Sequence, residues 1–326
     1  MEGPFVHGID PIIAEVGGVY LWWYGLSYSL GFLEIHLWLR RARGRLGLDL
    51  EEVYRLSILF ALGVLLGGRL VQVGFYEWPY YLHHPERIPA LWLGGMATHG
   101  LLLGAVVATW GFCRKSGKDF LTIADELVIP GAFLMGLGRI GNFIDGQIVG
   151  RETDIWWAVK FPDIEGFRHP VVLYDGLKNL LLIPLLVFVQ KKRSTPGVVL
   201  AHFIFWYAFL RIFVDLYRMY WTELLGLATG QSFNVIMSCV GVALLIWLSR
   251  RKRPAHAATL QPVKVPPDQR REARTNWVSR IILVAILLFA LTIPSNRTQD
   301  IPARYGHRHP GLHYSWLYPP LAPADK

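Results

Sequence analysis

The chain has 326 residues and a formal net charge of +9 at pH 7; 53% of its residues are hydrophobic and only 17% are charged. Soluble globular domains carry about 25% charged residues, so this composition excludes a disordered chain and an ordinary soluble enzyme. The presence of only 2 cysteines excludes a disulfide scaffold. The basic excess leaves two explanations, a nucleic-acid surface or the loops of a membrane protein.

Seven apolar runs of about 20 residues follow one another, each long enough to cross a bilayer as a helix. They lie at roughly 18–38, 56–76, 92–112, 121–145, 171–189, 197–217 and 231–249, and an eighth extends from about Trp277 to Ile293. Residues 1–17 contain no Lys or Arg, so the first run is not a signal peptide. We therefore expect an all-α polytopic membrane helix bundle with seven core transmembrane helices and an eighth near the C-terminus.

Composition divides the chain into three parts. Residues 1–253 hold the seven core spans, and the longest irregular stretch between them is 146–170. Residues 254–276 form a basic, Pro-rich segment, for which we expect a disordered cytoplasmic linker. Residues 277–326 add the eighth helix and a tail on the outside.

The basic residues predict the orientation, because cytoplasmic loops are enriched in Lys and Arg. With the N-terminus outside, 19 of the 33 Lys and Arg residues fall on inside segments and 9 on outside segments. The charge is therefore mostly a topology signal facing an anionic inner leaflet. We expect a membrane-lipid partner and no nucleic acid.

Five basic residues fall outside these loops. Arg55 is at a span edge, whereas Arg69, Arg139, Lys178 and Arg211 lie within spans. A charge at the centre of a span costs about 2.5–3.5 kcal/mol on insertion scales, so these side chains should face the bundle interior and have partners. Asp125 and Glu126, near the inner edge, are expected to snorkel to the interface.

Depth along the spans brings several of these groups to one level. Arg69, Arg139 and Arg211 each lie about six or seven residues before the outer end of a span, roughly 10 Å deep. His99 and Asp175 fall at a similar depth in the outer half. Arginines in a water-poor cavity indicate an anion, which Arg binds bidentately when it is a phosphate.

Structural roles remain possible for each residue taken alone. Arg211 could pair with Asp215 at i,i+4, and His99 could be a hydrogen-bonded packing residue rather than a general base. Tyr24 fits an aromatic belt at the membrane interface. The histidines of the C-terminal tail lack the carboxylates or cysteines typical of metal sites. No metal or cofactor is therefore expected.

Ordered motifs run along about residues 10–253. The clearest, Gly-Arg-Ile-Gly-Asn-Phe-Ile at 138–144, is followed by Gly146 and by Gly150-Arg151. The other motifs are Trp23-Tyr24-Gly25, Leu66-Gly67-Gly68-Arg69, Gly94-Gly95-Met96 with His99-Gly100, His169-Pro170 with Leu173-Tyr174, and Tyr207 with Arg211, Asp215 and Arg218. Together these motifs resemble the prolipoprotein diacylglyceryl transferase family.

The resemblance implies an enzyme of the bacterial inner membrane with its N-terminus in the periplasm and its active site in the outer half. Such an enzyme transfers the diacylglyceryl group of phosphatidylglycerol to the lipobox cysteine of a prolipoprotein signal peptide and releases glycerol phosphate. The resemblance assigns catalytic roles to Tyr24, His99, Arg139 and Arg211. The substrate-binding residues it implies are Arg69, Asn142, Asp145, Gly150, Tyr207, Asp215 and Arg218.

The sequence departs from the family pattern at five positions. Leu101 replaces the second Gly after the histidine, and Asp145 and Gln147 stand where the family has Asn and Glu. Val172 and Asp175 replace Gln and Glu around the Leu-Tyr pair. Two alternatives remain: a diverged relative with another acceptor or no activity, and an anion or lipid transporter. Transporters often carry paired broken helices. The Gly-rich end of the fourth span has no clear counterpart elsewhere in the sequence, which counts against a transporter.

Overall fold

The computed structural model describes residues 4–192, 195–219, 223–224, 227–251, 269–295 and 300–321. Its contacts divide the chain into two units, each built from separate stretches of sequence. Unit 1 comprises Met1–Gly8, Leu37–Asp49 and Asp119–Pro266, and unit 2 comprises Ile9–His36, Leu50–Lys118 and Pro267–Lys326. Helix α1 (Trp23–Leu46) contributes residues to both.

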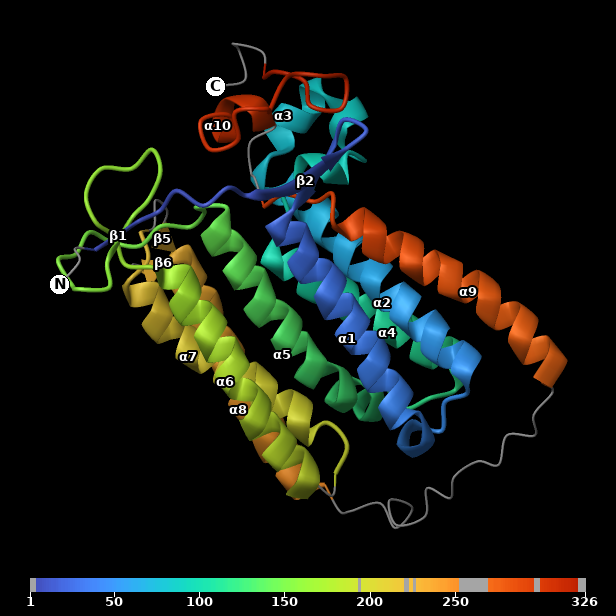
Figure 1. Ribbon diagram of the computed structural model, residues 1–326. Helices are drawn as coiled ribbons and strands as arrows, with labels where there is room; N and C mark the ends of the chain where they lie inside the picture. Colours follow the sequence, from blue (N-terminus) through green and yellow to red (C-terminus); the bar gives the residue numbers. More distant parts are fainter. Residues whose placement is uncertain are drawn as a thin grey trace. The chain divides into compact units, whose positions relative to one another are not determined.

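Four long helices of unit 1 pack in sequence order, α5 against α6, α6 against α7 and α7 against α8 (Figure 1). Their bounds are Phe120–Ile144 for α5, Val171–Lys192 for α6, Val198–Leu216 for α7 and Thr229–Arg250 for α8. Buried side chains of α5, α6 and α7 form one apolar core that includes Ile129, Leu182 and Phe203. Two short strand pairs accompany these helices, β1 (Phe5–Val6) parallel to β4 (Val159–Lys160), and β5 (Glu223–Leu224) antiparallel to β6 (Leu227–Ala228).

Side-chain caps explain where two of these helices begin. The carboxylate of Asp119 accepts a hydrogen bond from the Thr122 amide at 2.8 Å at the start of α5. The carboxylate of Asp125 accepts hydrogen bonds from the amides of Gly197 and Leu200, each at 2.8 Å, at the start of α7. The first-turn amides of α7 are thus satisfied by a group on α5.

The prediction that Asp125 and Glu126 snorkel is wrong, because both residues are 0% exposed. Asp125 caps α7, and Glu126 Oε2 accepts hydrogen bonds from Trp38 Nε1 and Arg45 Nη2, both at 3.1 Å. Two neighbouring helices supply the donors that water would otherwise provide, a relation that a single span does not reveal.

Unit 2 is built on close packing between α2 (Leu50–Val71) and α4 (Thr98–Ser116). Small residues face each other at the contact: a Cβ on Gly67 would lie 2.8 Å from the Cα of Gly104, and a Cβ on Gly100 would collide with the Gly67 carbonyl. Helix α2 continues into a π-helical turn, Gln72–Tyr76. Small residues at such contacts are typical of helix association within membranes.

The C-terminal segment belongs to unit 2. Helix α9 (Gln269–Ala290) packs on α2, and the short helix α10 (Ile301–Tyr305) joins a buried cluster with the hairpin of β2 (Ile12–Val16) and β3 (Val19–Trp22). The core of this cluster includes Tyr20, Trp22, Leu93, Tyr305 and Tyr318. Of the predicted linker 254–276, residues up to 268 lie outside the described part of the chain, and the remainder is helical rather than irregular.

Two predicted spans begin later than their apolar residues suggest. The first was expected from residue 18, but α1 begins at Trp23 because Gly17 and Gly18, with φ of +59° and +80°, form the turn of a hairpin. The third was expected from residue 92, but α4 begins at Thr98, after Gly94 and Gly95 with φ of +79° and +78°. Apolar content alone does not separate strand or turn from helix.

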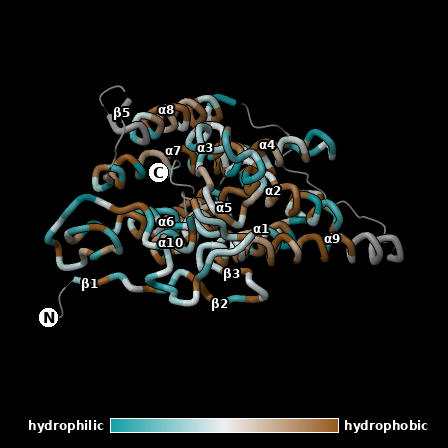
Figure 2. Tube along the Cα trace, turned by 90° about the horizontal axis from the view of Figure 1, so that it is seen from above, coloured by the Kyte–Doolittle hydropathy of each residue, from teal (hydrophilic) through white to brown (hydrophobic). Residues whose placement is uncertain are grey.

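Five helical segments among the described residues are long and apolar enough to cross a membrane. They are Leu50–Tyr76, Phe120–Ile144, Val171–Lys192, Val198–Leu216 and Gln231–Arg250, and Trp277–Ala290 is a shorter apolar helix. Figure 2 shows hydrophobic residues in runs along the helices and hydrophilic ones in the connecting segments. The protein is therefore a multi-pass membrane protein built as an all-α bundle.

Candidate active site

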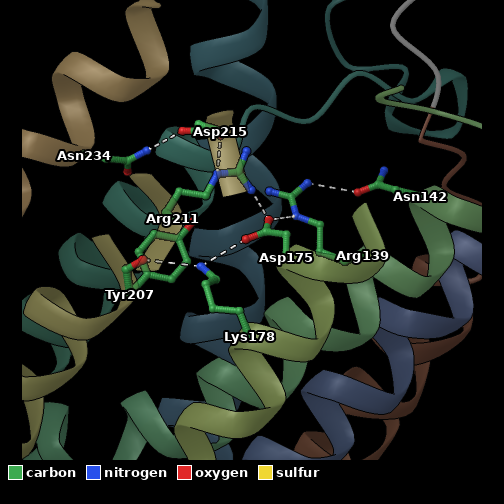
Figure 3. Close-up of polar contacts among 8 residues, drawn as sticks. All are labelled: Arg139, Asn142, Asp175, Lys178, Tyr207, Arg211, Asp215 and Asn234. Atoms are coloured by element: carbon green, nitrogen blue, oxygen red, sulfur yellow. Dashed lines mark hydrogen bonds and ion pairs between the residues drawn. The ribbon is translucent and has the colours of Figure 1, made fainter. Parts of the chain in front are cut away.

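A single buried carboxylate lies at the centre of the site in unit 1. Asp175, on α6, has a side chain that is 1% exposed. Its Oδ2 atom pairs with Arg139 Nε on α5 at 2.5 Å and also with Arg211 Nη1 on α7 (Figure 3). Its Oδ1 atom pairs with Lys178 Nζ, one turn along α6, at 3.0 Å. Three helices thus direct three basic side chains at one aspartate.

A second carboxylate holds Arg211 from its other side. Arg211 Nε lies 2.9 Å from Asp215 Oδ1, one turn along α7, and Asp215 Oδ2 accepts a hydrogen bond from Asn234 Nδ2 on α8 at 2.8 Å. The i,i+4 pair, which the sequence left open as a structural role for Arg211, is present. It fixes the guanidinium of Arg211 between two carboxylates, with 9% of its side chain exposed.

Arg139 is held less completely. Its Nε donates to Asp175 Oδ2 and its Nη1 donates to Asn142 Oδ1 at 3.1 Å, while its Nη2 donates no hydrogen bond to the described residues. Its side chain is 13% exposed. A guanidinium fixed on one edge and open on the other can still bind a bidentate anion.

The charges of this bonded group do not cancel. Arg139, Lys178 and Arg211 carry three positive charges, and Asp175 and Asp215 carry two negative ones. A narrow pocket beside the group is lined by Arg139, Ile148, Val171, Val172, Asp175, Arg211, Val214 and Arg218. Arg139 and Arg211 therefore both line this pocket with guanidinium groups that are already held by a carboxylate.

The loop after α5 is fastened to the ends of α6 and α7 through Gly150. Gly150 forms a β-bridge with Arg218, the Arg151 amide donates to the Tyr217 carbonyl at 2.8 Å, and the His169 amide donates to the Arg151 carbonyl at 3.0 Å. A Cβ on Gly150 would collide with the His169 carbonyl oxygen. The glycine is therefore required by close backbone approach.

Asp145 and Gln147, two of the residues at which the sequence departs from the family pattern, lie in the turn at the end of α5. The Gln147 amide donates to the Asn142 carbonyl at 2.9 Å, and Gly146 has a φ of +69°. Asp145 and Gln147 are both buried, at 1% and 7% exposure. The exchanged acid and amide thus lie inside the loop that follows Asn142.

An aromatic cluster lies beside this loop, at the start of α6. Trp157 Nε1 donates to the Tyr174 hydroxyl at 2.6 Å, and His169 Nδ1 lies 3.1 Å from the same hydroxyl. The His169 and Tyr217 rings are 4.9 Å apart. Burial lowers the pKa of His169 below its usual value.

The structure brings together five of the predicted site residues in the bonded group or beside it: Arg139, Asn142, Tyr207, Arg211 and Asp215. Arg218 lines the pocket, and Gly150 bridges to it. Sequence reasoning missed Asn234, for which an isolated Asn in a span gives little signal. It noted Lys178 as an intramembrane charge without assigning it to the site. The spacing of three residues from Asp175 was the available signal.

Three predicted residues belong to unit 2. Arg69 donates to the carbonyls of Ile88, Gly94 and Arg87, at 2.9, 2.5 and 2.7 Å, and so secures the loop before α4. The Tyr24 hydroxyl lies 3.0 Å from that of Tyr28 on the next turn of α1. His99 lies in the first turn of α4 with its side chain exposed. Their participation in one site with the unit 1 group stays a prediction.

The fold and the buried group define a polytopic membrane protein with a cluster of charged side chains buried inside its helix bundle. The model of the family described as prolipoprotein diacylglyceryl transferase matches residues 11–247. The chain is 38% identical over 252 residues to the phosphatidylglycerol--prolipoprotein diacylglyceryl transferase of Geobacter sulfurreducens, covering 75% of this chain and 97% of that protein. It is 38% identical over 262 residues to the enzyme of the same name from Aromatoleum aromaticum, covering 76% and 97%. The chain belongs to the prolipoprotein diacylglyceryl transferase family.

Proposed function

We propose that this protein transfers the diacylglyceryl group of phosphatidylglycerol to the lipobox cysteine of a prolipoprotein signal peptide. The observation that carries the proposal is the bonded group around Asp175. It places Arg139 and Arg211 on one carboxylate and on the lining of one pocket, inside a chain whose relatives are named for this reaction. Phosphatidylglycerol offers this site a single negatively charged phosphodiester.

The reaction follows from these groups. The S–H bond of the cysteine breaks, sulfur forms a bond to the terminal glycerol carbon of the diacylglyceryl group, and the bond from that carbon to the phosphate oxygen breaks. Glycerol phosphate leaves with the electron pair of that bond. Negative charge grows on the phosphate as it departs, and the two fixed guanidinium groups stabilise it in a water-poor site.

Asn142 and Arg139 act together at the phosphate in this proposal. Asn142 accepts from Arg139 Nη1 through its Oδ1 atom, at 3.1 Å, which leaves its Nδ2 group to orient a headgroup oxygen. Arg139 Nη2 is the donor available to the phosphate among the described contacts. Arg218, on the pocket lining, adds a further positive charge.

The thiol needs a proton acceptor, since the thiolate is the nucleophile. We retain His99 for this step, because imidazole is the side-chain type whose charge changes near neutral pH. Tyr24 is retained as a catalytic residue, and Arg69 as a residue that contacts the substrate. The lipobox cysteine as acceptor, the bacterial inner membrane, the N-terminus outside and a site in the outer half belong to the same proposal. The orientation rests on the distribution of Lys and Arg.

The experiment is mass spectrometry of a lipobox peptide incubated with the full-length protein and phosphatidylglycerol in detergent micelles. A diacylglyceryl mass on the peptide, with release of glycerol phosphate, is the expected result. Arg139→Ala and Arg211→Ala should lower transfer by at least a hundredfold, whereas the matched control Arg114→Ala, at an exposed position in α4, should not. Full activity in both site variants would contradict the phosphate role, and lipid binding without transfer would favour a diverged relative or a transporter.

A further inference from the structure

The C-terminal tail, residues 300–321, lies beyond the residues that the family model matches, yet it is packed into the core of unit 2. Three of its residues, Ile301, Tyr305 and Tyr318, are 0%, 0% and 1% exposed. They share one buried cluster with the hairpin of β2 and β3 and with Leu93, which precedes α4. The tail is therefore a packed part of the fold.

The hairpin holds the tail in place. The Tyr20 amide donates to the Tyr318 hydroxyl at 3.0 Å, at a buried position. The ring centres of Trp22 and Tyr305 lie 5.1 Å apart. Because the tail is fixed in this way, it can support a further segment that it contacts.

That further segment is the stretch of chain that leads to α4. Trp92 Nε1 donates to the Leu317 carbonyl oxygen of the tail at 3.1 Å, and the next residue, Leu93, is 2% exposed inside the cluster. Arg69 holds the same stretch from α2, through the Gly94 carbonyl oxygen at 2.5 Å. The segment before α4 is thus fixed by two sets of contacts, one from α2 and one from the tail.

Two glycines explain why the start of α4 needs this support. Gly94 and Gly95, with φ of +79° and +78°, separate Leu93 from α4, and glycine backbone turns readily. The first-turn amides of a helix also lack partners within the helix. His99 lies in this first turn, with its side chain exposed. A proton acceptor must stand within hydrogen-bond reach of the group that it deprotonates, so the position of this turn matters for the reaction.

We propose that the C-terminal tail is a positioning element for His99: it seats Trp92 and Leu93 and so keeps the first turn of α4 where the imidazole accepts the proton of the cysteine thiol. This inference rests on the proposed function and adds to it a segment outside the family motifs. The tail acts through the segment before α4, and its own side chains take no part in the bonds that form and break.

The test uses three single variants of the full-length protein in mixed micelles. Trp92→Phe removes the hydrogen bond to the tail and keeps an aromatic ring. Ile301→Asp places a charge at a site that is 0% exposed, which opposes seating of the tail. Trp316→Ala is the matched control within the tail, because Trp316 is 88% exposed. Thermal unfolding identifies which variants fold.

Hydrogen exchange measures the seating of the segment independently of activity. The amides of Leu93 and Ala97 each donate to a backbone carbonyl at 3.1 Å. Exchange of a hydrogen-bonded amide requires local opening. Both amides should exchange about tenfold faster in Ile301→Asp and about threefold faster in Trp92→Phe, and at the wild-type rate in Trp316→Ala.

Kinetics separate positioning from a loss of folded protein. At pH 7, kcat should fall about tenfold in Ile301→Asp and about threefold in Trp92→Phe, while the KM for phosphatidylglycerol is unchanged. A cysteine thiol ionises by itself near pH 8.5, so at pH 9 a proton acceptor matters less and both deficits should shrink to less than about twofold. A structural defect would lower kcat equally at both pH values, and that result would overturn the proposal. A rise in kcat would also overturn it, since the tail would then cover the site.

Failure of the proposed function can be distinguished from failure of this inference. If the wild-type protein transfers nothing, the reaction is refuted, and hydrogen exchange still decides whether the tail seats the segment before α4. If the wild type transfers and neither exchange nor kcat responds to Ile301→Asp or Trp92→Phe, the reaction stands and the role of the tail is refuted. Should Ile301→Asp not fold, the response of Trp92→Phe decides alone.

Discussion

Replacing the central carboxylate tests whether the buried group holds the bundle together. Asp175→Asn keeps the size of the side chain but leaves Arg139, Lys178 and Arg211 with Asp215 as the remaining carboxylate of the group. The net charge of these five side chains rises from +1 to +2. Removing one partner of a buried ion pair typically costs about 3–5 kcal/mol. We expect a loss of that order in stability and a fall in transfer of at least a hundredfold, because both arginines lose their shared anchor.

Thermal unfolding in detergent micelles, followed together with transfer activity, measures both effects. The informative comparison is the double variant Asp175→Asn with Lys178→Gln, which returns the group to a net charge of +1. Groups in contact are coupled by about 0.5–3 kcal/mol, so the double variant should be more stable than Asp175→Asn alone. If Asp175→Asn were as stable and active as the wild type, or if Lys178→Gln changed the stability of Asp175→Asn by the same amount as that of the wild type, the electrostatic account would be refuted.

Three further variants test individual contacts. Asn142→Ala removes the acceptor of Arg139 Nη1 and should lower kcat about tenfold at saturating lipid. An unchanged kcat would count against the role of Asn142 at the phosphate. Gly150→Ala places a methyl group against the His169 carbonyl and should lower the unfolding temperature and transfer, whereas Gly131→Ala in α5, which meets nothing within 4 Å, should change neither. Burial raises the pKa of Tyr318 to about 12. The folded state therefore keeps Tyr318 protonated where the unfolded chain ionises, so its contribution to stability is complete below about pH 10 and is lost as the pH rises to 12. Tyr318→Phe should lose about 0.5–1.5 kcal/mol at neutral pH, since the hydroxyl accepts from the Tyr20 amide at 3.0 Å, and should abolish this alkaline decline in thermal unfolding.

Local patterns predicted part of the site. An arginine and an aspartate four residues apart on a helix share a face, and Arg211 and Asp215 do pair at 2.9 Å. Intramembrane charges were expected to have partners, and Arg139, Lys178 and Arg211 all do. These predictions required only the helical period and the cost of charge in a bilayer.

The sequence did not predict the contacts between helices. Asp175 joins three cations because α5, α6 and α7 are neighbours, and no spacing within one span indicates that arrangement. Arg69 shows the same limit: its depth matched that of Arg139, yet its donors meet three backbone carbonyls of the following loop. The depth of a charged residue in its span predicts that it needs partners. Whether those partners are side chains or backbone carbonyls depends on which segments of the folded chain lie beside it.

The C-terminal segment changes how the first span motif should be understood. The Trp22 amide donates to the Leu291 carbonyl at 2.9 Å, and a Cβ on Gly25 would collide with the carbonyl oxygens at the end of α9. Tyr24 lies between these two contact points in the sequence. A segment beyond the region matched by the family model therefore packs directly on a family motif. Since Gly25 permits this approach only because it lacks a side chain, the motif glycine supports the start of α1 and the seating of α9 at once.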